Sequence, residues 1–231
     1  MLLVSWFEDP HRATRDLDLL GFGDPSPRAI VAVFREILAA DVADGVEFDL
    51  NALRVEQIRE EVEYGGLRLR TTASISGARI SVTIDVGFGD ALEPGAEFID
   101  YPSMLDLPAP RVRAYARETV IAEKFQAMVA LGRANSRMKD FYDVWLLSQS
   151  FSFYDDRLAR AIAATFERRG TPIPAELPDA LTQAFAEDDQ KRQQWRAFVE
   201  NVSVDPGTLS EVIATIGAFL MEQAATALKL K

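Results

Sequence analysis

Two aspartates separated by one residue, Asp16 and Asp18, form the first pattern in this sequence that could do chemistry. The run 12–20 predicts a strand that ends at a glycine. Alternate residues of a strand share a face and lie roughly 7 Å apart, so the two carboxylates can converge on one cation. A third carboxylate, Asp85, lies in an apolar run, where an unpaired negative charge would be costly.

An Asp-x-Asp pair with a third aspartate from another strand is what metal-assisted phosphoryl chemistry requires, because two cations stabilise the entering and leaving oxygens. Oxygen ligands favour Mg²⁺ or Mn²⁺. The alternative is that Asp16 and Asp18 lie on a solvated face and Asp85 pairs with an arginine such as Arg12 or Arg68.

Lys124 is a second candidate, because the residues at helical spacing from it are apolar. They are Val120, Ile121, Ala127, Met128 and Leu131. A lysine within a buried stripe needs an anionic partner, either a carboxylate or a phosphate. The alternative is a lysine whose ammonium reaches the solvent at the edge of the stripe. The pattern favours a functional lysine.

The segment 136–147 predicts a helix whose first turns are rich in charge. Asp140 has Arg137 three residues before it and faces partly inward, and Asp143 has Lys139 four residues before it. Helix capping and salt bridges between residues three or four apart explain such a helix start without any function. From the residues alone, that structural interpretation is preferred here.

The composition limits the possible functions. The 231 residues include no cysteine and one histidine, His11, which excludes thiol chemistry and histidine-rich metal sites and argues against a Ser-His-Asp triad. The formal charge of −11 argues against nucleic-acid binding driven by overall charge but leaves room for a local basic groove. For such a groove we consider Arg111, Arg113, Arg117, Arg133 and Arg137. We expect a cytoplasmic protein, since neither a signal peptide nor a membrane-spanning run is evident.

The candidate residues must be positioned by two parts of the chain, which differ in their predicted secondary structure. Up to residue 108, short strands alternate with helix, including a hairpin of 67–75 with 79–86 and a helix from 28 to about 41. That helix has an apolar stripe of Ala29, Ala32, Val33, Ile37 and Ala40. From residue 111 the pattern is almost wholly helical, with expected helices at 114–132, 136–147, 157–169, 179–186, 191–201 and 208–230. The last of these begins with a capping box formed by Thr208 and Glu211. The proline-rich stretch 101–110 separates them.

Four motifs in order together resemble the AbiEii-type nucleotidyltransferase toxins. They are RATRDLDLLG at 12–21, IDVGFGD at 84–90, ETVIAEK at 118–124 and RMKDFYDV at 137–144. The similarity extends over nearly the whole chain. It implies the DNA polymerase β-like nucleotidyltransferase fold: an α+β protein with a small mixed β-sheet and flanking helices at 1–108, followed by a helical bundle at 109–231.

The resemblance also implies roles for individual residues. Asp16 and Asp18 would hold Mg²⁺ or Mn²⁺, with Asp85 as a third ligand. Lys124 and Asp140 would be catalytic. The remaining polar residues of the first and fourth motifs would contact the nucleotide or its phosphates: Arg12, Thr14, Arg137 and Lys139.

As a member of this family, the protein would transfer a nucleotide from an NTP to an acceptor such as tRNA and would be paired with an antitoxin. The family fold carries a Gly-Gly/Ser loop about fifteen residues before its Asp-x-Asp pair, and here that loop would fall at or before Met1. The alternative function is therefore a catalytically degenerate nucleotidyltransferase fold that binds nucleotide or protein.

Overall fold

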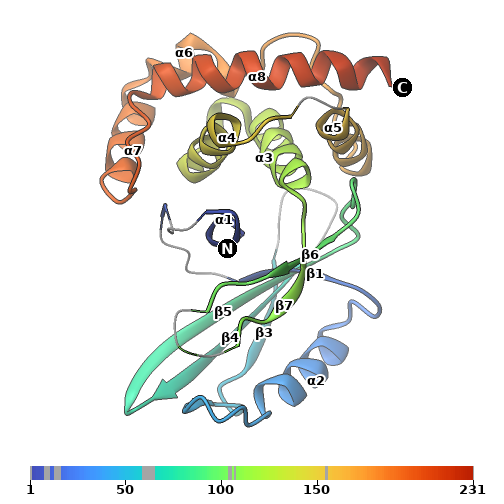
Figure 1. Ribbon diagram of the computed structural model, residues 1–231, viewed down its shortest axis with the longest axis vertical. Helices are drawn as coiled ribbons and strands as arrows, with labels where there is room; N and C mark the ends of the chain where they lie inside the picture. Colours follow the sequence, from blue (N-terminus) through green and yellow to red (C-terminus); the bar gives the residue numbers. More distant parts are fainter. Residues whose placement is uncertain are drawn as a thin grey trace. The chain divides into compact units, whose positions relative to one another are not determined.

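A computed structural model describes residues 2–7, 11–12, 17–58, 66–103, 106, 108–153 and 156–230 (Figure 1). The chain forms two compact units. The described residues of the first are 17–58 and 66–90, and those of the second are 2–7, 11–12 and everything described from 91 onward. The sequence predicted a division at residue 108, whereas here the stretch after residue 90 belongs with the helices.

The first unit is built on a mixed β-sheet, as the sequence predicted. Its strands are β1 (Leu17–Gly21), β2 (Val46–Phe48), β3 (Arg54–Ile58), β4 (Gly66–Ile75) and β5 (Ala78–Phe88). The order is β1-β5-β4-β2, and β3 also pairs with β4. β1 runs parallel to β5, and the other pairs are antiparallel.

The predicted hairpin is β4 with β5, joined by Ser76 and Gly77. Both residues have positive φ, 47° and 84°. Two consecutive residues of this conformation make the tight turn whose twist matches that of the flanking strands. Glycine adopts it without strain, which explains Gly77.

Helix α2 (Pro27–Leu38) covers one face of the sheet, has Ser26 as its N-cap, and begins one residue before the predicted start and ends about three residues before the predicted end. The predicted apolar stripe was wrong. Ile30 and Phe34 are the buried positions, while Val33 and Ile37 are 49% and 56% exposed. The buried pair packs against the sheet residues Leu67, Leu69, Ile84 and Val86.

The described part of the strand predicted over 12–20 is β1, Leu17–Gly21. Arg12 forms an isolated bridge with Val202. Thr14 and Asp16 lie outside the described residues. The strand ends at Gly21 as predicted, where a Cβ atom would collide with the ring of Phe88.

The second unit is mostly helical. It comprises α1 (Leu3–Trp6), α3 (Arg117–Leu131), α4 (Met138–Ser150), α5 (Arg157–Arg168), α6 (Gln183–Ala186), α7 (Asp189–Val199) and α8 (Leu209–Lys229). The short 3₁₀ turns η1 (Gly132–Ala134) and η2 (Asp179–Leu181) lie between them. The part expected to be almost wholly helical begins with a strand, β7 (Arg111–Ala114), which pairs with β6 (Glu97–Asp100). The predicted helix 179–186 is also divided, into η2 and α6.

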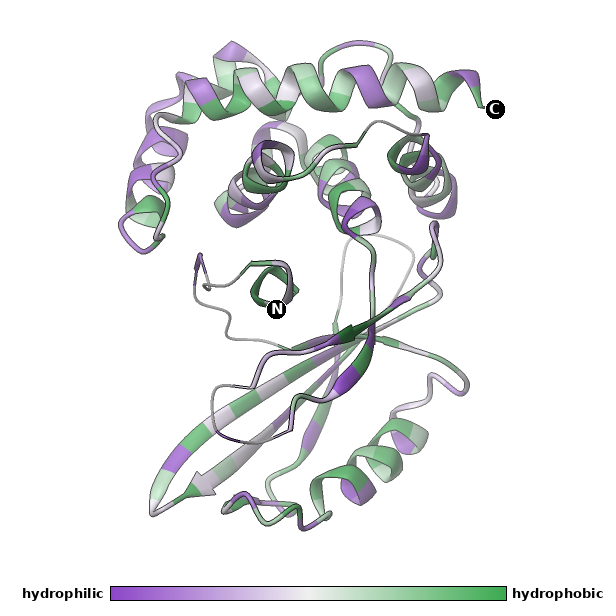
Figure 2. Cartoon of the chain, in the orientation of Figure 1, coloured by the Kyte–Doolittle hydropathy of each residue, from purple (hydrophilic) through white to green (hydrophobic). Residues whose placement is uncertain are grey.

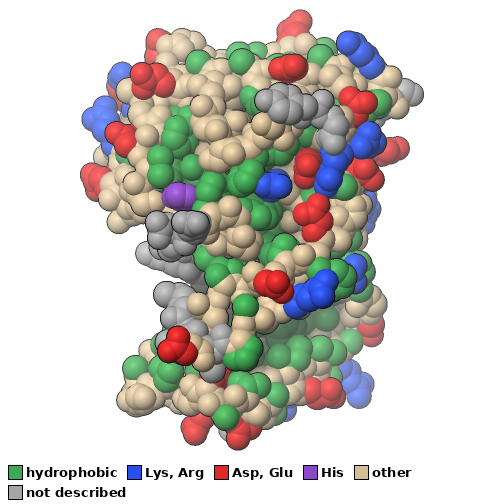
Figure 3. All heavy atoms as spheres, viewed as in Figure 1, with side chains coloured by type: hydrophobic (Ala, Val, Ile, Leu, Met, Phe, Trp, Pro, Cys, Tyr) green, Lys and Arg blue, Asp and Glu red, His purple; other side chains and the backbone are tan. Residues whose placement is uncertain are grey.

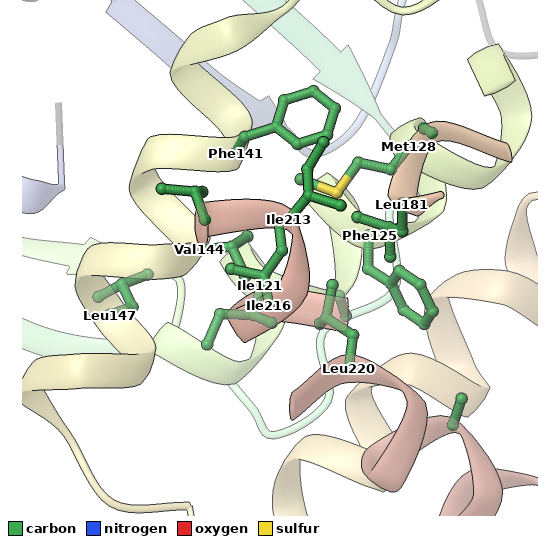
Figure 4. Close-up of a cluster of buried hydrophobic side chains, with 14 of the residues drawn as sticks. Ile121, Phe125, Met128, Phe141, Val144, Leu147, Leu181, Ile213, Ile216 and Leu220 are labelled. Carbon is green, nitrogen blue, oxygen red and sulfur yellow. The ribbon is translucent and has the colours of Figure 1, made fainter. Parts of the chain in front are cut away.

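The core of this unit is formed by α3, α4, α5 and α8. Figure 4 shows side chains of α3, α4 and α8 converging, among them Phe125, Phe141 and Ile216. The aromatic residues Phe141 and Tyr142 are fully buried in this core.

Helix α8 lies across α3, α4 and α5 in Figure 1. It begins with the predicted capping box of Thr208 and Glu211. By length and composition alone it could cross a membrane, although no membrane-spanning run was predicted from the sequence. Polar residues are interspersed along it (Figure 2), and its face containing Val212, Ile216 and Leu220 is buried in the core. This is the pattern of a core helix.

Candidate functional site

Lys124 lies between two buried carboxylates of α4. Its Nζ is 2.7 Å from Asp140 Oδ1 and 2.9 Å from Asp143 Oδ2. The two aspartates are 0% and 1% exposed, and the lysine side chain is 16% exposed. Asp140 and Asp143 are three residues apart in α4, so both face the same side of the helix, toward α3.

An arginine flanks each carboxylate. Arg12 donates from Nε and Nη2 to the two oxygens of Asp143, both at 2.7 Å. Arg137 Nε lies 2.7 Å from Asp140 Oδ2 and forms an ion pair with it, but the angle between the two groups does not meet that of a hydrogen bond. The result is an alternating row of charges: Arg12, Asp143, Lys124, Asp140 and Arg137. We call these five residues the charge row. With three cations and two anions, it carries one surplus positive charge.

The protonation states follow from this arrangement. Burial alone would lower the pKa of Lys124, but Asp143 and Asp140 outweigh burial and raise it above its ordinary value. Burial alone would raise the pKa of Asp143, but Lys124 and Arg12 lower it below its ordinary value. At neutral pH the lysine is therefore charged and can neutralise a phosphate but cannot act as a base.

The structure decides between the alternatives that the sequence left open at the charge row. The inward position of Lys124 is confirmed, and its anionic partners are carboxylates. The pairing of Arg137 with Asp140 is also confirmed. The purely local interpretation of Asp143 was wrong, since its partners are Arg12 and Lys124, while Lys139 is exposed. Arg12 lies 131 residues from Asp143 in the chain, and no sequence signal pointed to that contact.

Two of the three predicted metal-ligating aspartates lie side by side in the first unit. The strand register pairs Asp18 with Asp85, and Asp85 in turn with Arg68 of β4. All three share the face of the sheet opposite α2, because the core residues alternate with them. Arg68 donates from Nε and Nη2 to the two oxygens of Asp85 at 2.8 and 2.6 Å. This is the arginine pairing considered as an alternative for Asp85.

The chemistry of these donors fits a hard divalent cation. Asp18 is exposed, and each Asp85 oxygen has a second lone pair beyond the one that accepts from Arg68. Within the described part of the chain, no group of three or more potential ligands forms a metal site. Asp16, the remaining predicted ligand, is outside that part.

Of the arginines considered for a nucleic-acid groove, three lie near the start of α3. Arg117 stacks on Phe151, with its guanidinium carbon 4.0 Å from the ring centroid. Arg111 lies 5.2 Å from the ring centroid of Phe98 on the β6–β7 ribbon. Acidic and basic side chains are interspersed on the face of the molecule seen in Figure 3.

The chain combines a mixed sheet that has paired carboxylates on one face with a helical unit that contains a buried lysine–aspartate row. The model of the family described as nucleotidyl transferase AbiEii toxin, type IV toxin–antitoxin system, matches residues 1–217. The chain therefore belongs to the AbiEii nucleotidyltransferase toxin family, and it is a nucleotidyltransferase.

Solved structures with a similar fold come from Helicobacter pylori. JHP933 superposes with a TM-score of 0.54 at 14% identity, covering 99% of this chain and 82% of that one. A second protein, provisionally described as a nucleotidyltransferase, superposes with a TM-score of 0.52 at 13% identity, covering 100% and 85%. These likenesses confirm the predicted fold class. No curated protein matches the sequence.

Proposed function

We propose that this toxin transfers a nucleotide from an NTP to an RNA acceptor such as tRNA and needs Mg²⁺ or Mn²⁺ to do so. A hydroxyl oxygen of the acceptor forms a bond to the α-phosphorus of the NTP. The bond from this phosphorus to the bridging oxygen of the β-phosphate breaks, pyrophosphate leaves with that oxygen, and the hydroxyl proton passes to water.

The observation that carries this proposal is the charge row with its surplus positive charge. Lys124 and Arg137 are the cations that would contact the phosphates, since Arg137 is 48% exposed and the raised pKa of Lys124 keeps it charged. Asp140 would hold both cations in place. The exposed Lys139 would add a further phosphate contact, as would Thr14, which lies outside the described residues.

Asp16, Asp18 and Asp85 are the residues that would hold the cation. When bound, the cation neutralises triphosphate charge and stabilises the charge that develops on the oxygens during transfer. Arg12 was expected to contact phosphate. Because two of its nitrogens donate to Asp143, we now propose that it acts by fixing that carboxylate.

The β6–β7 ribbon supports a single-stranded RNA acceptor. Phe98 is 62% exposed, Arg111 lies over its ring, and Arg113 is its cross-strand partner. An exposed aromatic ring next to arginines is suited to stacking a base while the arginines contact phosphates. As in other toxin–antitoxin pairs, we expect a cognate antitoxin to counteract the activity in the cytoplasm, where NTPs and tRNA are present.

The experiment is transfer of label from α-labelled NTPs to total tRNA with Mg²⁺. We compare the parent chain with Lys124→Met and Asp18→Asn, and we measure nucleotide binding in parallel. We expect labelled RNA from the parent and at least about 100-fold less from each variant. In other enzymes, removing one active-site group that stabilises the charge of the transition state lowers the rate by about this factor. Arg192→Gln, which changes an exposed arginine of α7, serves as the control and should keep parental activity.

Two results would count against the proposal. Equal labelling by the parent and Lys124→Met would remove the charge row from the reaction. Binding of NTP without transfer to RNA or protein would favour the alternative, a degenerate nucleotide-binding fold.

A further inference from the structure

Lys191 of α7 is a buried lysine that no motif indicated. It is 8% exposed, and its Nζ donates to the backbone carbonyl of Asn135 at 2.7 Å. The same ammonium lies 5.2 Å from the centroid of the Phe185 ring. Both partners that the described residues give this cation are uncharged, in contrast to Lys124. A buried ammonium without a carboxylate is costly, so a role beyond packing has to be considered.

The carbonyl that Lys191 contacts belongs to the segment that leads into α4. Asn135 is itself fully buried, and its Oδ1 accepts from the backbone N–H of Arg137 at 2.8 Å. Its own backbone N–H donates to the carbonyl of Gly132 at 3.2 Å. Lys191 therefore fixes the residue that sets the backbone of Arg137, at the N-cap of α4.

A second contact reaches α4 through an aromatic pair. The ring of Phe185, over which Lys191 lies, stacks on Phe141 with centroids 5.5 Å apart and an interplanar angle of 24°. Phe141 follows Asp140 directly in α4. Lys191 thus supports the first turn of α4 on both sides of Asp140, by the Asn135 carbonyl before it and by Phe141 after it.

We propose that Lys191 is a positioning residue for nucleotidyl transfer, which fixes the first turn of α4 so that Asp140 holds Lys124 and Arg137 in the geometry that receives the phosphates. This inference rests on the proposed function of the charge row. A methionine of similar length could fill the same space without the cost of burying a charge. What it could not supply is the charge-assisted hydrogen bond to Asn135.

The test compares Lys191→Met with Trp195→Phe. Trp195 is a matched control because it lies on the same helix, is 2% exposed and also donates to a backbone carbonyl, that of Gly207 at 3.0 Å, which precedes α8 rather than α4. We measure kcat and KM for the NTP, the Tm, and the ¹⁵N NMR signal of Arg137 Nε–H without substrate.

We expect Lys191→Met to lower kcat about tenfold or more, because small displacements of positioned groups are costly to the rate. NTP binding should change less than about twofold, since the cations of the charge row remain. The Arg137 signal should shift or broaden. Trp195→Phe should lower the Tm by a similar amount but leave kcat and the Arg137 signal close to parental values.

The proposal is overturned if Lys191→Met leaves kcat and the Arg137 signal unchanged, or if both variants lower kcat in proportion to the lost Tm. If Lys191→Met does not fold, Lys191→Gln, which keeps a shorter uncharged donor, replaces it. If the parent chain transfers no nucleotide, the proposed function fails. The Arg137 signal then still decides whether Lys191 positions this ion pair.

Discussion

At the scale of single residues, the charge row shows how burial and pairing set protonation. Lys124 and Asp143 are both buried, and burial by itself would favour the uncharged form of each side chain. Each keeps its charge because the other is present, with Arg12 and Asp140 as the additional partners. Removing one partner of such a buried pair typically costs about 3–5 kcal/mol, because the remaining charge is left uncompensated.

The lowered pKa of Asp143 gives a pH-dependent prediction. The Asp143 carboxylate stabilises the folded protein fully above the ordinary pKa of an aspartate, near 3.8. This stabilisation is lost as the pH falls through the lower pKa that Asp143 has in the folded state. We expect Asp143→Asn to be destabilised at pH 7. The difference from the parent in free energy of unfolding should shrink below about pH 4.

This difference can be measured by urea unfolding with tryptophan fluorescence, because all three tryptophans, Trp6, Trp145 and Trp195, belong to the second unit. Asp189→Asn is the control, since that carboxyl is exposed and its ion-pair partner Arg192 lies three residues further along the same helix. A difference between parent and Asp143→Asn that stays constant down to pH 2.5 would contradict the expected ionisation of Asp143.

At the scale of elements, α2 shows why a helical pattern can be assigned to the wrong face. It has two apolar stripes, one with Ile30 and Phe34 and the other with Val33 and Ile37. Helical periodicity fits both. The sheet selects the first, whose larger aromatic side chain packs on the core of the first unit.

We expect the two stripes to respond differently to substitution. Phe34→Ala should destabilise the first unit by about 3–5 kcal/mol, as for other buried phenylalanines. Ile37→Glu should change its stability by less than about 0.5 kcal/mol, because the side chain is 56% exposed. Far-UV circular dichroism during urea unfolding measures both. Equal destabilisation by the two substitutions would show that the exposed stripe is covered in solution.

At the scale of the whole molecule, the formal charge of −11 means that RNA has to be attracted by a local surface. If that surface is the β6–β7 ribbon, few phosphates are contacted and the salt dependence of binding is shallow. For single strands, each contacted phosphate contributes a slope of roughly −0.7 in a plot of log affinity against log salt concentration.

We therefore expect the combined substitution of Arg111→Gln and Arg113→Gln to reduce the steepness of this slope by about 1.4. Phe98→Ala should weaken RNA binding by about 1–3 kcal/mol with the slope unchanged, because stacking is not electrostatic. Fluorescence anisotropy with a labelled single-stranded RNA measures both effects, with Arg192→Gln as the control. A slope unaffected by losing both arginines would exclude the ribbon as the RNA-binding surface.

The sequence by itself determined the features that depend on neighbours in the chain. The Ser76-Gly77 turn, the capping box at Thr208 and the inward position of Lys124 each follow from a few consecutive residues or one helical period. The four motifs, in their order, were sufficient to indicate the nucleotidyltransferase family. These predictions needed no knowledge of which elements pack together.

Only the tertiary structure decided which charges meet. Arg12 pairs with Asp143 across 131 residues of chain, and Lys191 contacts Asn135 across 56. Asp85 pairs with Arg68 because the register of β4 and β5 places them side by side. Ionic and hydrogen-bond partners are chosen by distance in the folded chain, and the sequence gives residue types without those distances. That is why Lys124 could be predicted to need an anion, while its partner carboxylates could not be named.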